Sequence, residues 1–310
     1  MEMLYKKYPK KNQLTEALMD LLYLEREAVY RRLRNEVTFS ANEIAKIAYT
    51  WNISLDEVIG ISQKESSLEV YLWDCYKPSP KVLDNMRNWV QELYNAKNLP
   101  ELGYLEVTNH LPRILACGFP YINRFNLLKW MYQYVDEETP PFSKVVFEEE
   151  VAKVLADLYI ASKNIANISF IFDHLLFNYL MSDIHFFSSI YLITDEEIEL
   201  IKKDLYDLLN YLSEVAIKGC WPETGNKVKI YISNVNIETN YSYYYGHGNN
   251  EQLCCAHTIG KDIYTSNPTL VEDFKIWLQS KKRSSVQISE TDAKSRIEFF
   301  MKQHQLIDSL

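Results

Sequence analysis

Helix-start signals recur along this 310-residue chain and constrain its fold more than any other feature. Ser40 with Glu43, and Thr194 with Glu197, have the Ser/Thr-x-x-Glu spacing of a capping box, in which each side chain satisfies a backbone N–H at a helix start. The same spacing occurs at residues 54–57. Glycine is scarce, at 8 residues, which argues against architectures built on glycine turns. We therefore predict a mainly helical chain.

The N-terminal segment, residues 13–60, divides into four short predicted helices. The first has one apolar face with the spacing i, i+3, i+4, i+7, formed by Leu14, Ala17, Leu18 and Leu21. The second, residues 25–35, turns Ala28, Val29 and Leu33 inward and carries basic residues on its other face. Two short helices joined by a turn, the second basic and outward-facing, are typical of a helix-turn-helix.

The basic second helix suits the major groove of B-DNA, where an arginine can bind guanine O6 and N7 with two hydrogen bonds. A helix that begins at residues 25–27 would place its first side chains at the base edges. The basic residues further along, and those before the first helix, would lie nearer the phosphates: Arg31, Arg32, Arg34, Lys10 and Lys11.

The segment 14–60 resembles the helix-turn-helix of Cro/repressor-type proteins, in the version found at the N-terminus of Bacteroidetes transcriptional regulators. It reads LTEALMDLLYLEREAVYRRLRNE, then FSANEIAKIA and ISLDEVIG. The resemblance implies that residues 25–34 are the recognition helix. Tyr23 departs from the pattern, which usually has Gly in the turn, and Glu25 stands where a Ser or Thr cap is usual. The predicted DNA-binding residues are Arg26, Glu27, Tyr30, Arg31, Arg34, Lys10, Lys11, Ser40 and Asn42.

The formal net charge of −9 disfavours nucleic-acid binding for the whole chain, but the charge is unevenly distributed. Residues 6–34 hold eight basic and four acidic residues. Residues 1–60 are neutral overall, so the remainder carries the entire −9. Phosphate contacts supply most of the affinity for DNA. A small local excess of positive charge predicts a modest DNA binder that acts as a dimer.

A polar, proline-containing stretch predicts a domain boundary after this segment. We expect a helix-turn-helix domain at 1–65, a linker at 66–80, a helical domain at 81–220, and a small antiparallel sheet plus helices at 221–310. Just after the linker, four apolar residues have the 4, 3, 4 spacing of a packed helix seam. The four residues are Val82, Met86, Trp89 and Leu93. Their spacing fits an ordinary bundle helix, which we favour, or a coiled coil that forms a dimer.

Residues 100–219 read as successive helices, whereas residues 227–238 alternate as a strand does. Further strands are expected at 241–245, 253–259 and 263–265, and helices at 268–281 and after 289. The predicted fold class is mainly α with a small α+β part: an N-terminal helix-turn-helix, a helical middle, and a C-terminal antiparallel β meander followed by two helices.

Three groups of residues suggest other chemistry, and each has a stronger structural explanation. His174 and His185 could bind a metal ion together, but they would share a helix face only if one helix runs through both. Cys254, Cys255 and His257 could also bind a metal ion, but the two adjacent cysteines would point to opposite sides of a strand. The tyrosines at 241 and 243–245 could line a ligand pocket or simply favour a strand. An enzyme would need a shared cluster from His174, His185, His247, Cys254, Cys255 and His257. We predict no catalytic residue, metal site or cofactor.

The sequence therefore predicts a DNA-binding transcriptional regulator that reads double-stranded DNA in the major groove. The C-terminal region would serve dimerisation, giving a homodimer, and could also sense a small effector. Five scattered cysteines show no disulfide framework, and no secretory signal or membrane span is recognisable, so a cytoplasmic location without membrane contact is expected. The alternative is a protein-interaction adaptor without DNA binding.

Overall fold

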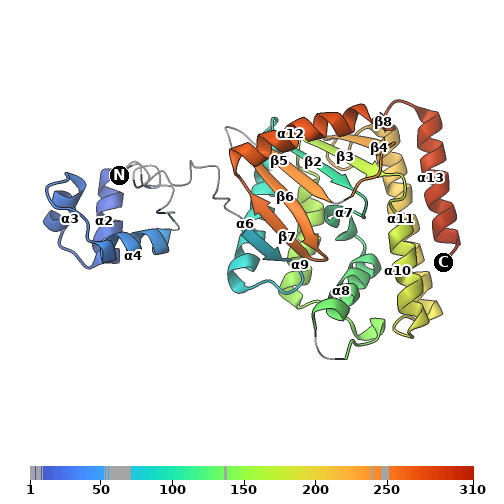
Figure 1. Ribbon diagram of the computed structural model, residues 1–310, viewed down its shortest axis with the longest axis horizontal. Helices are drawn as coiled ribbons and strands as arrows, with labels where there is room; N and C mark the ends of the chain where they lie inside the picture. The colour runs from blue at the N-terminus through green and yellow to red at the C-terminus, as the bar shows by residue number, and fades with distance from the viewer. Residues whose placement is uncertain are drawn as a thin grey trace. The chain divides into compact units, whose positions relative to one another are not determined.

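The protein divides into two compact units, Met1–Leu68 and Glu69–Leu310, in a computed structural model (Figure 1). The structure describes residues 4, 8, 10–51, 53, 55, 71–135, 138–238, 240–245 and 251–310. Residues 54 and 57, which would form the third predicted capping box, lie outside the described residues, as do residues 66–70 of the predicted linker.

The N-terminal unit is built from three described helices, α2 (Lys11–Leu22), α3 (Arg26–Leu33) and α4 (Ala41–Trp51). Tyr23 ends α2 with φ 54° and ψ 45°, the left-handed conformation, and this reverses the chain toward α3. The apolar faces of the three helices meet in one small core of Leu4, Leu14, Leu18, Leu22, Val29, Leu33, Ile47 and Trp51.

The C-terminal unit is organised around one eight-stranded mixed sheet. Its strands are β1 (Tyr71–Asp74), β2 (Gly103–Thr108), β3 (Asn167–Asp173), β4 (Lys227–Ser233), β5 (Tyr241–Tyr245), β6 (Glu251–Thr258), β7 (Lys261–Thr265) and β8 (Ser285–Gln287). They lie in the order β1-β7-β6-β5-β2-β3-β4-β8. The three strands β2, β3 and β4 are parallel, and every other pairing is antiparallel.

Helices cover both faces of the sheet, and those between the parallel strands β2, β3 and β4 form the crossovers that such strands need. The helices are α6 (Pro80–Asn95), α7 (Arg113–Ala116), α8 (Pro120–Tyr134), α9 (Glu149–Ser162), α10 (Asn178–Ser189), α11 (Asp195–Lys218), α12 (Pro268–Arg283) and α13 (Ala293–Asp308), with short 3₁₀ turns η2 (Ala96–Asn98) and η3 (Phe142–Lys144). The crossover from β2 to β3 contains α7, α8 and α9, and that from β3 to β4 contains α10 and α11.

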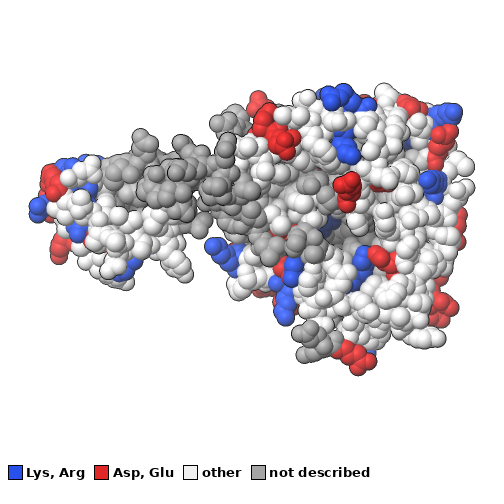
Figure 2. Space-filling view, in the orientation of Figure 1, with Lys and Arg blue, Asp and Glu red and all other residues white. Residues whose placement is uncertain are grey.

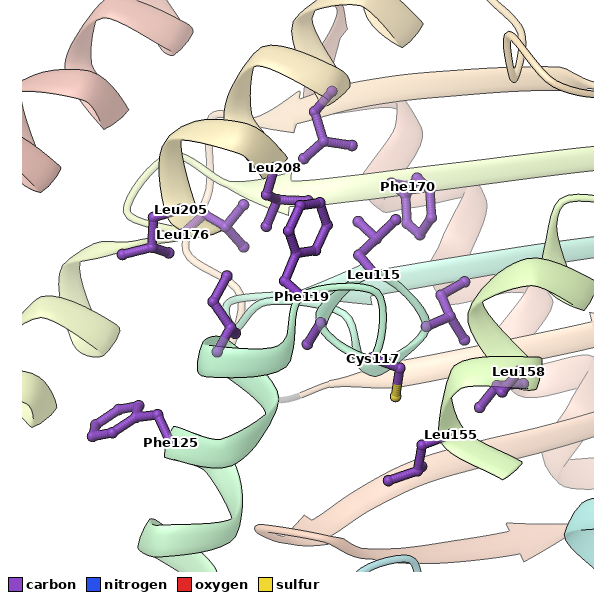
Figure 3. Close-up of a cluster of buried hydrophobic side chains, with 14 of the residues drawn as sticks. Leu115, Cys117, Phe119, Phe125, Leu155, Leu158, Phe170, Leu176, Leu205 and Leu208 are labelled. Atoms are coloured by element: carbon purple, nitrogen blue, oxygen red, sulfur yellow. The ribbon is translucent and has the colours of Figure 1, made fainter. Parts of the chain in front are cut away.

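The two faces of the sheet have separate apolar cores. On one face α12 packs Val271, Phe274 and Leu278 against β2, β3 and β5. On the other face the remaining helices form a much larger core, to which α7, α8, α9 and α11 contribute side chains together with Phe170 of β3 (Figure 3). The unit is therefore a helix–sheet–helix sandwich, as Figure 1 shows.

The predicted fold class is wrong. The strands expected to form a separate C-terminal meander belong to a sheet whose centre is parallel, and two of its parallel strands, β2 and β3, lie within the segment 81–220 predicted to be helical. A strand buried on both faces has a continuous apolar run, which periodicity cannot tell from a buried helix. This ambiguity explains why the sequence alone does not reveal β2 and β3 as strands.

The apolar seam of α6 packs within its own unit. Met86 and Leu93 are buried in the large core, and Val82 and Trp89 pack against it. Since these residues contact the same chain, the seam behaves as an ordinary bundle helix, the interpretation favoured from its spacing. Among the described residues, no helix has both the length and the apolar character needed to cross a bilayer.

A buried carboxylate joins two helices of the C-terminal unit. Asp204 of α11 is 6% exposed and accepts hydrogen bonds from the backbone N–H groups of Tyr121, at 2.6 Å, and Ile122, at 3.3 Å. Both N–H groups belong to the first turn of α8, where a helix has no internal acceptors for its N–H groups. Asp204 therefore caps α8 from a different helix.

We expect Asp204→Ala to lower the free energy of unfolding by about 1–3 kcal/mol, because two N–H groups lose their acceptor. Asp204→Asn keeps an acceptor oxygen and should lose less. Asp207→Ala, at an exposed position on the same helix, is the control and should have little effect. Urea denaturation measures all three, and equal losses for Asp204→Ala and Asp207→Ala would contradict the capping role.

The left-handed backbone at Tyr23 gives a second stability prediction. A residue with a Cβ atom is strained in this conformation, whereas glycine is not. Tyr23→Gly should stabilise α2 and α3 by about 0.5 kcal/mol, after allowing for the greater freedom of glycine in the unfolded chain. The same change at exposed Tyr49, within α4, should destabilise the unit by up to about 1 kcal/mol. Amide hydrogen exchange of α2–α4 measures both changes, and a shared sign would refute the argument.

Candidate DNA-binding surface

Helix α3 has its orientation set by the core of the N-terminal unit. Val29 and Leu33 are buried, so the opposite face of the helix is turned to solvent. Glu27 and Arg31 are exposed on that outer side, and Arg26 is exposed at the first residue of the helix. The structure therefore presents together three of the residues predicted to face DNA, near the start and middle of one short helix.

Acidic neighbours pair with the arginines of this surface. Arg26 lies 3.6 Å from Glu16, and Arg31 lies 3.8 Å from Glu36. Arg34 is held between Glu27 and Glu36, each at 2.9 Å. Figure 2 accordingly shows blue and red side chains side by side around α3. These side chains are about half or more exposed, and exposed ion pairs contribute little stability, so phosphate oxygens can replace the carboxylates at low cost.

Three predicted residues lie at the edge of this surface. Tyr30 is half-buried against the small core, and the Lys11 ammonium lies 5.4 Å from the centre of its ring. Lys10 is exposed immediately before α2. The two lysines therefore flank α2 at its first turn, and Lys11 reaches across to α3.

Ser40 and Asn42 lie at the start of α4. The Ser40 hydroxyl accepts a hydrogen bond from the Glu43 N–H at 3.3 Å, and the Glu43 carboxylate accepts one from the Ser40 N–H at 2.7 Å. This is the predicted capping box, so the Ser40 side chain has a structural role. Asn42 is exposed in the first turn of α4.

Arg32 points inward, unlike the phosphate-facing position expected from the sequence. Its guanidinium binds both carboxylate oxygens of Glu43, at 2.8 Å and 3.2 Å, and donates to the Ala28 carbonyl. Burial opposes ionisation of Glu43, but hydrogen bonds from Arg32 and Ser40 hold the pKa of this carboxyl below its usual value. Arg32 therefore joins α3 to α4. Its spacing of three residues from Val29, on the inward face, is the sequence signal for this role.

The other candidate residues are not gathered into one site. His174 follows β3 and lies 3.3 Å from its neighbour Asp173, whereas His185 lies on α10, so no single helix carries both. Cys254 and Cys255 are adjacent on β6. His247 and the side chain of His257 lie outside the described residues, as do those of Tyr241, Tyr244 and Tyr245. Within the described part of the chain, no group of three His, Cys, Asp or Glu side chains is arranged to hold a metal ion.

Comparisons with protein-family models, with curated proteins and with solved structures return no match to this chain.

Proposed function

We propose that the N-terminal unit binds double-stranded DNA through α3 and that the protein is a sequence-specific transcriptional regulator. The observation that carries the proposal is the α2–turn–α3 arrangement, with a left-handed turn residue and an exposed, arginine-rich second helix. Arg26 and Glu27, in the first turn of α3, would meet base edges in the major groove. Arg31, Arg34, Lys10 and Lys11 would contact phosphates.

The paired acids suggest how specificity would arise in this proposal. Before binding, Glu16, Glu27 and Glu36 screen the arginines, so weak nonspecific attraction to DNA is reduced. At a matching site the arginines exchange these carboxylates for base and phosphate acceptors. Glu27 is then free to accept a hydrogen bond from a cytosine amino group, the contact that an acidic side chain makes in the major groove.

A homodimer is part of the proposal because one unit offers few phosphate contacts. Two copies on a twofold DNA site would double them, with half-sites about 34–36 Å apart for a spacing of one helical turn. The α6 seam is already packed inside the C-terminal unit, so a dimer would need a different surface.

A second candidate function, a protein-interaction adaptor, has one observation in its favour. Tyr23 and Tyr49 of the N-terminal unit are 87% and 91% exposed, and exposed tyrosines are common in protein interfaces. An adaptor would bind its partner through these rings. Such binding would depend less on salt than DNA binding does.

DNA binding is tested by selecting duplexes from a random library and titrating the selected duplex at several salt concentrations. We expect log–log slopes that grow by about 0.9 for each phosphate contact. Arg31→Ala and Arg34→Ala should each weaken all duplexes and reduce the slope by about 1, whereas Arg26→Ala should relax the base preference at one position.

Arg87→Ala is the matched control, since Arg87 is an exposed, ion-paired arginine in the C-terminal unit. It should leave DNA affinity unchanged. The proposal fails if no duplex is enriched, if affinity does not fall with salt, or if Arg26→Ala combined with Arg31→Ala binds as the wild type does. A protein partner lost in Tyr23→Ala and Tyr49→Ala but retained at moderate salt would establish the adaptor.

A further inference from the structure

The C-terminal unit contains a cavity of about 510 Å³ between the sheet and helices α6–α9. Its volume is typical of a small-molecule site. One wall is the face of the sheet opposite α12, and the other includes Trp89 of α6 and Asn126 and Lys129 of α8. All the described residues that line the cavity belong to the compact unit Glu69–Leu310.

The sheet wall carries a row of polar side chains where a core would be apolar. The strand register places Glu106 of β2 opposite Ser242 of β5, Ser242 opposite Cys254 of β6, and Cys254 opposite Tyr264 of β7. All four residues line the cavity. Directly opposed residues point to the same face of a sheet, so the fold has built a polar strip across four strands.

Glu106 is the unusual member of this row because it is a carboxyl group, 5% exposed, within a strand that is buried throughout. The Tyr104 hydroxyl donates to its Oε2 at 2.8 Å and lies 3.0 Å from the Ser242 hydroxyl. Among the described residues, no lysine, arginine or histidine is within ion-pair distance of it. Burying a carboxylate without a counterion is costly, which suggests that the counterion comes from outside the chain.

The cations in the cavity wall are already neutralised by other acids. Arg113 forms a bidentate ion pair with Asp262, and Lys129 forms an ion pair with Asp183 of α10. The wall acids without such a partner are Glu106, inside the cavity, and Glu238, which is exposed. The uncompensated charge of the cavity is therefore negative, and an anionic ligand would meet no free cation among the described side chains.

We propose that this cavity binds a small organic cation, an amine, amidine or guanidine, whose N–H groups pair with the Glu106 carboxylate. Aromatic side chains of the wall, Tyr76 and Trp89, offer apolar and π surfaces to the body of such a ligand. The amides of Asn126 and Asn240 can donate to or accept from its polar groups. This proposal does not depend on the proposed DNA binding, because the cavity and the DNA-binding surface belong to different units of the chain.

The proton on Glu106 gives the site a pH dependence. Burial raises the pKa of Glu106 to about 7, against opposing contributions from the Tyr104 hydrogen bond and the Arg113 charge. Burial lowers the pKa of His110, a histidine of the wall. Burial also keeps the phenols and the thiol of the wall neutral, by raising the pKa values of Tyr76, Tyr104, Cys254 and Tyr264. A cation must displace the proton of Glu106, so its affinity should rise as pH increases through about 7.

The experiment titrates the full chain by calorimetry with three probes of similar shape: benzamidine, a cation; benzamide, neutral; and benzoate, an anion. At about pH 8 benzamidine should bind at least about tenfold more tightly than either of the others. Its affinity should fall about tenfold between about pH 8 and about pH 6, as Glu106 becomes protonated.

Glu106→Gln keeps the shape of the side chain and removes its charge, so it should abolish the preference for benzamidine and the pH dependence. The folded state raises the pKa of Glu106, so this residue destabilises the wild-type fold increasingly as pH rises toward 7. The variant should therefore melt no lower than the wild type at about pH 8. Glu150→Gln, on the exposed part of α9, is the control and should bind as the wild type does.

Three results would overturn the proposal. One is the absence of benzamidine binding to the wild type at about 10 mM, well above the range expected for a specific fragment. Another is equal binding of benzamide or benzoate. The third is unchanged benzamidine affinity in a folded Glu106→Gln protein, or, if that variant does not fold, a wild-type affinity that does not change between about pH 6 and about pH 8.

Discussion

The complete burial of β2 is the constraint on which the C-terminal unit depends. This strand lies between β3 and β5, so both of its edges are hydrogen-bonded, and helices or other side chains cover both of its faces. All six of its residues are buried. Every polar side chain on β2 must therefore find its partners inside the fold, because water cannot supply them. Glu106 and Tyr104 meet this requirement only in part, through one hydrogen bond to each other and one between Tyr104 and Ser242.

The two faces of β2 meet different partners, and this difference creates the cavity. On one face Leu105 and Val107 pack closely against α12. On the other face the polar row from Glu106 to Tyr264 cannot be covered by an apolar helix without leaving polar groups unsatisfied. The Arg113–Asp262 pair joins α7 to β7 across this region and holds the helical wall beside the sheet. The cavity is thus lined by this ion pair and by the polar row of the sheet.

The N-terminal unit is stabilised mainly by interactions between neighbouring helices. Its core is small, and the Arg32–Glu43 pair and the Ser40 capping box join α3 to α4 and define the start of α4. The remaining arginines of α3 are left on the surface with exposed acidic partners. One arginine therefore has a structural role, and three remain available for the proposed DNA contacts.

The sequence by itself determined the helix starts and the positions of the short N-terminal helices, because capping and the 3.6-residue period act over a few residues. The capping boxes at Ser40 and Thr194 both occur as predicted. Tertiary structure alone decided that residues 103–108 and 167–173 are parallel strands, that Arg32 points inward, and that Glu106 lies in a cavity wall. These features depend on pairing and burial between distant segments. A glutamate in an apolar run becomes unusual only when both faces of its strand are covered.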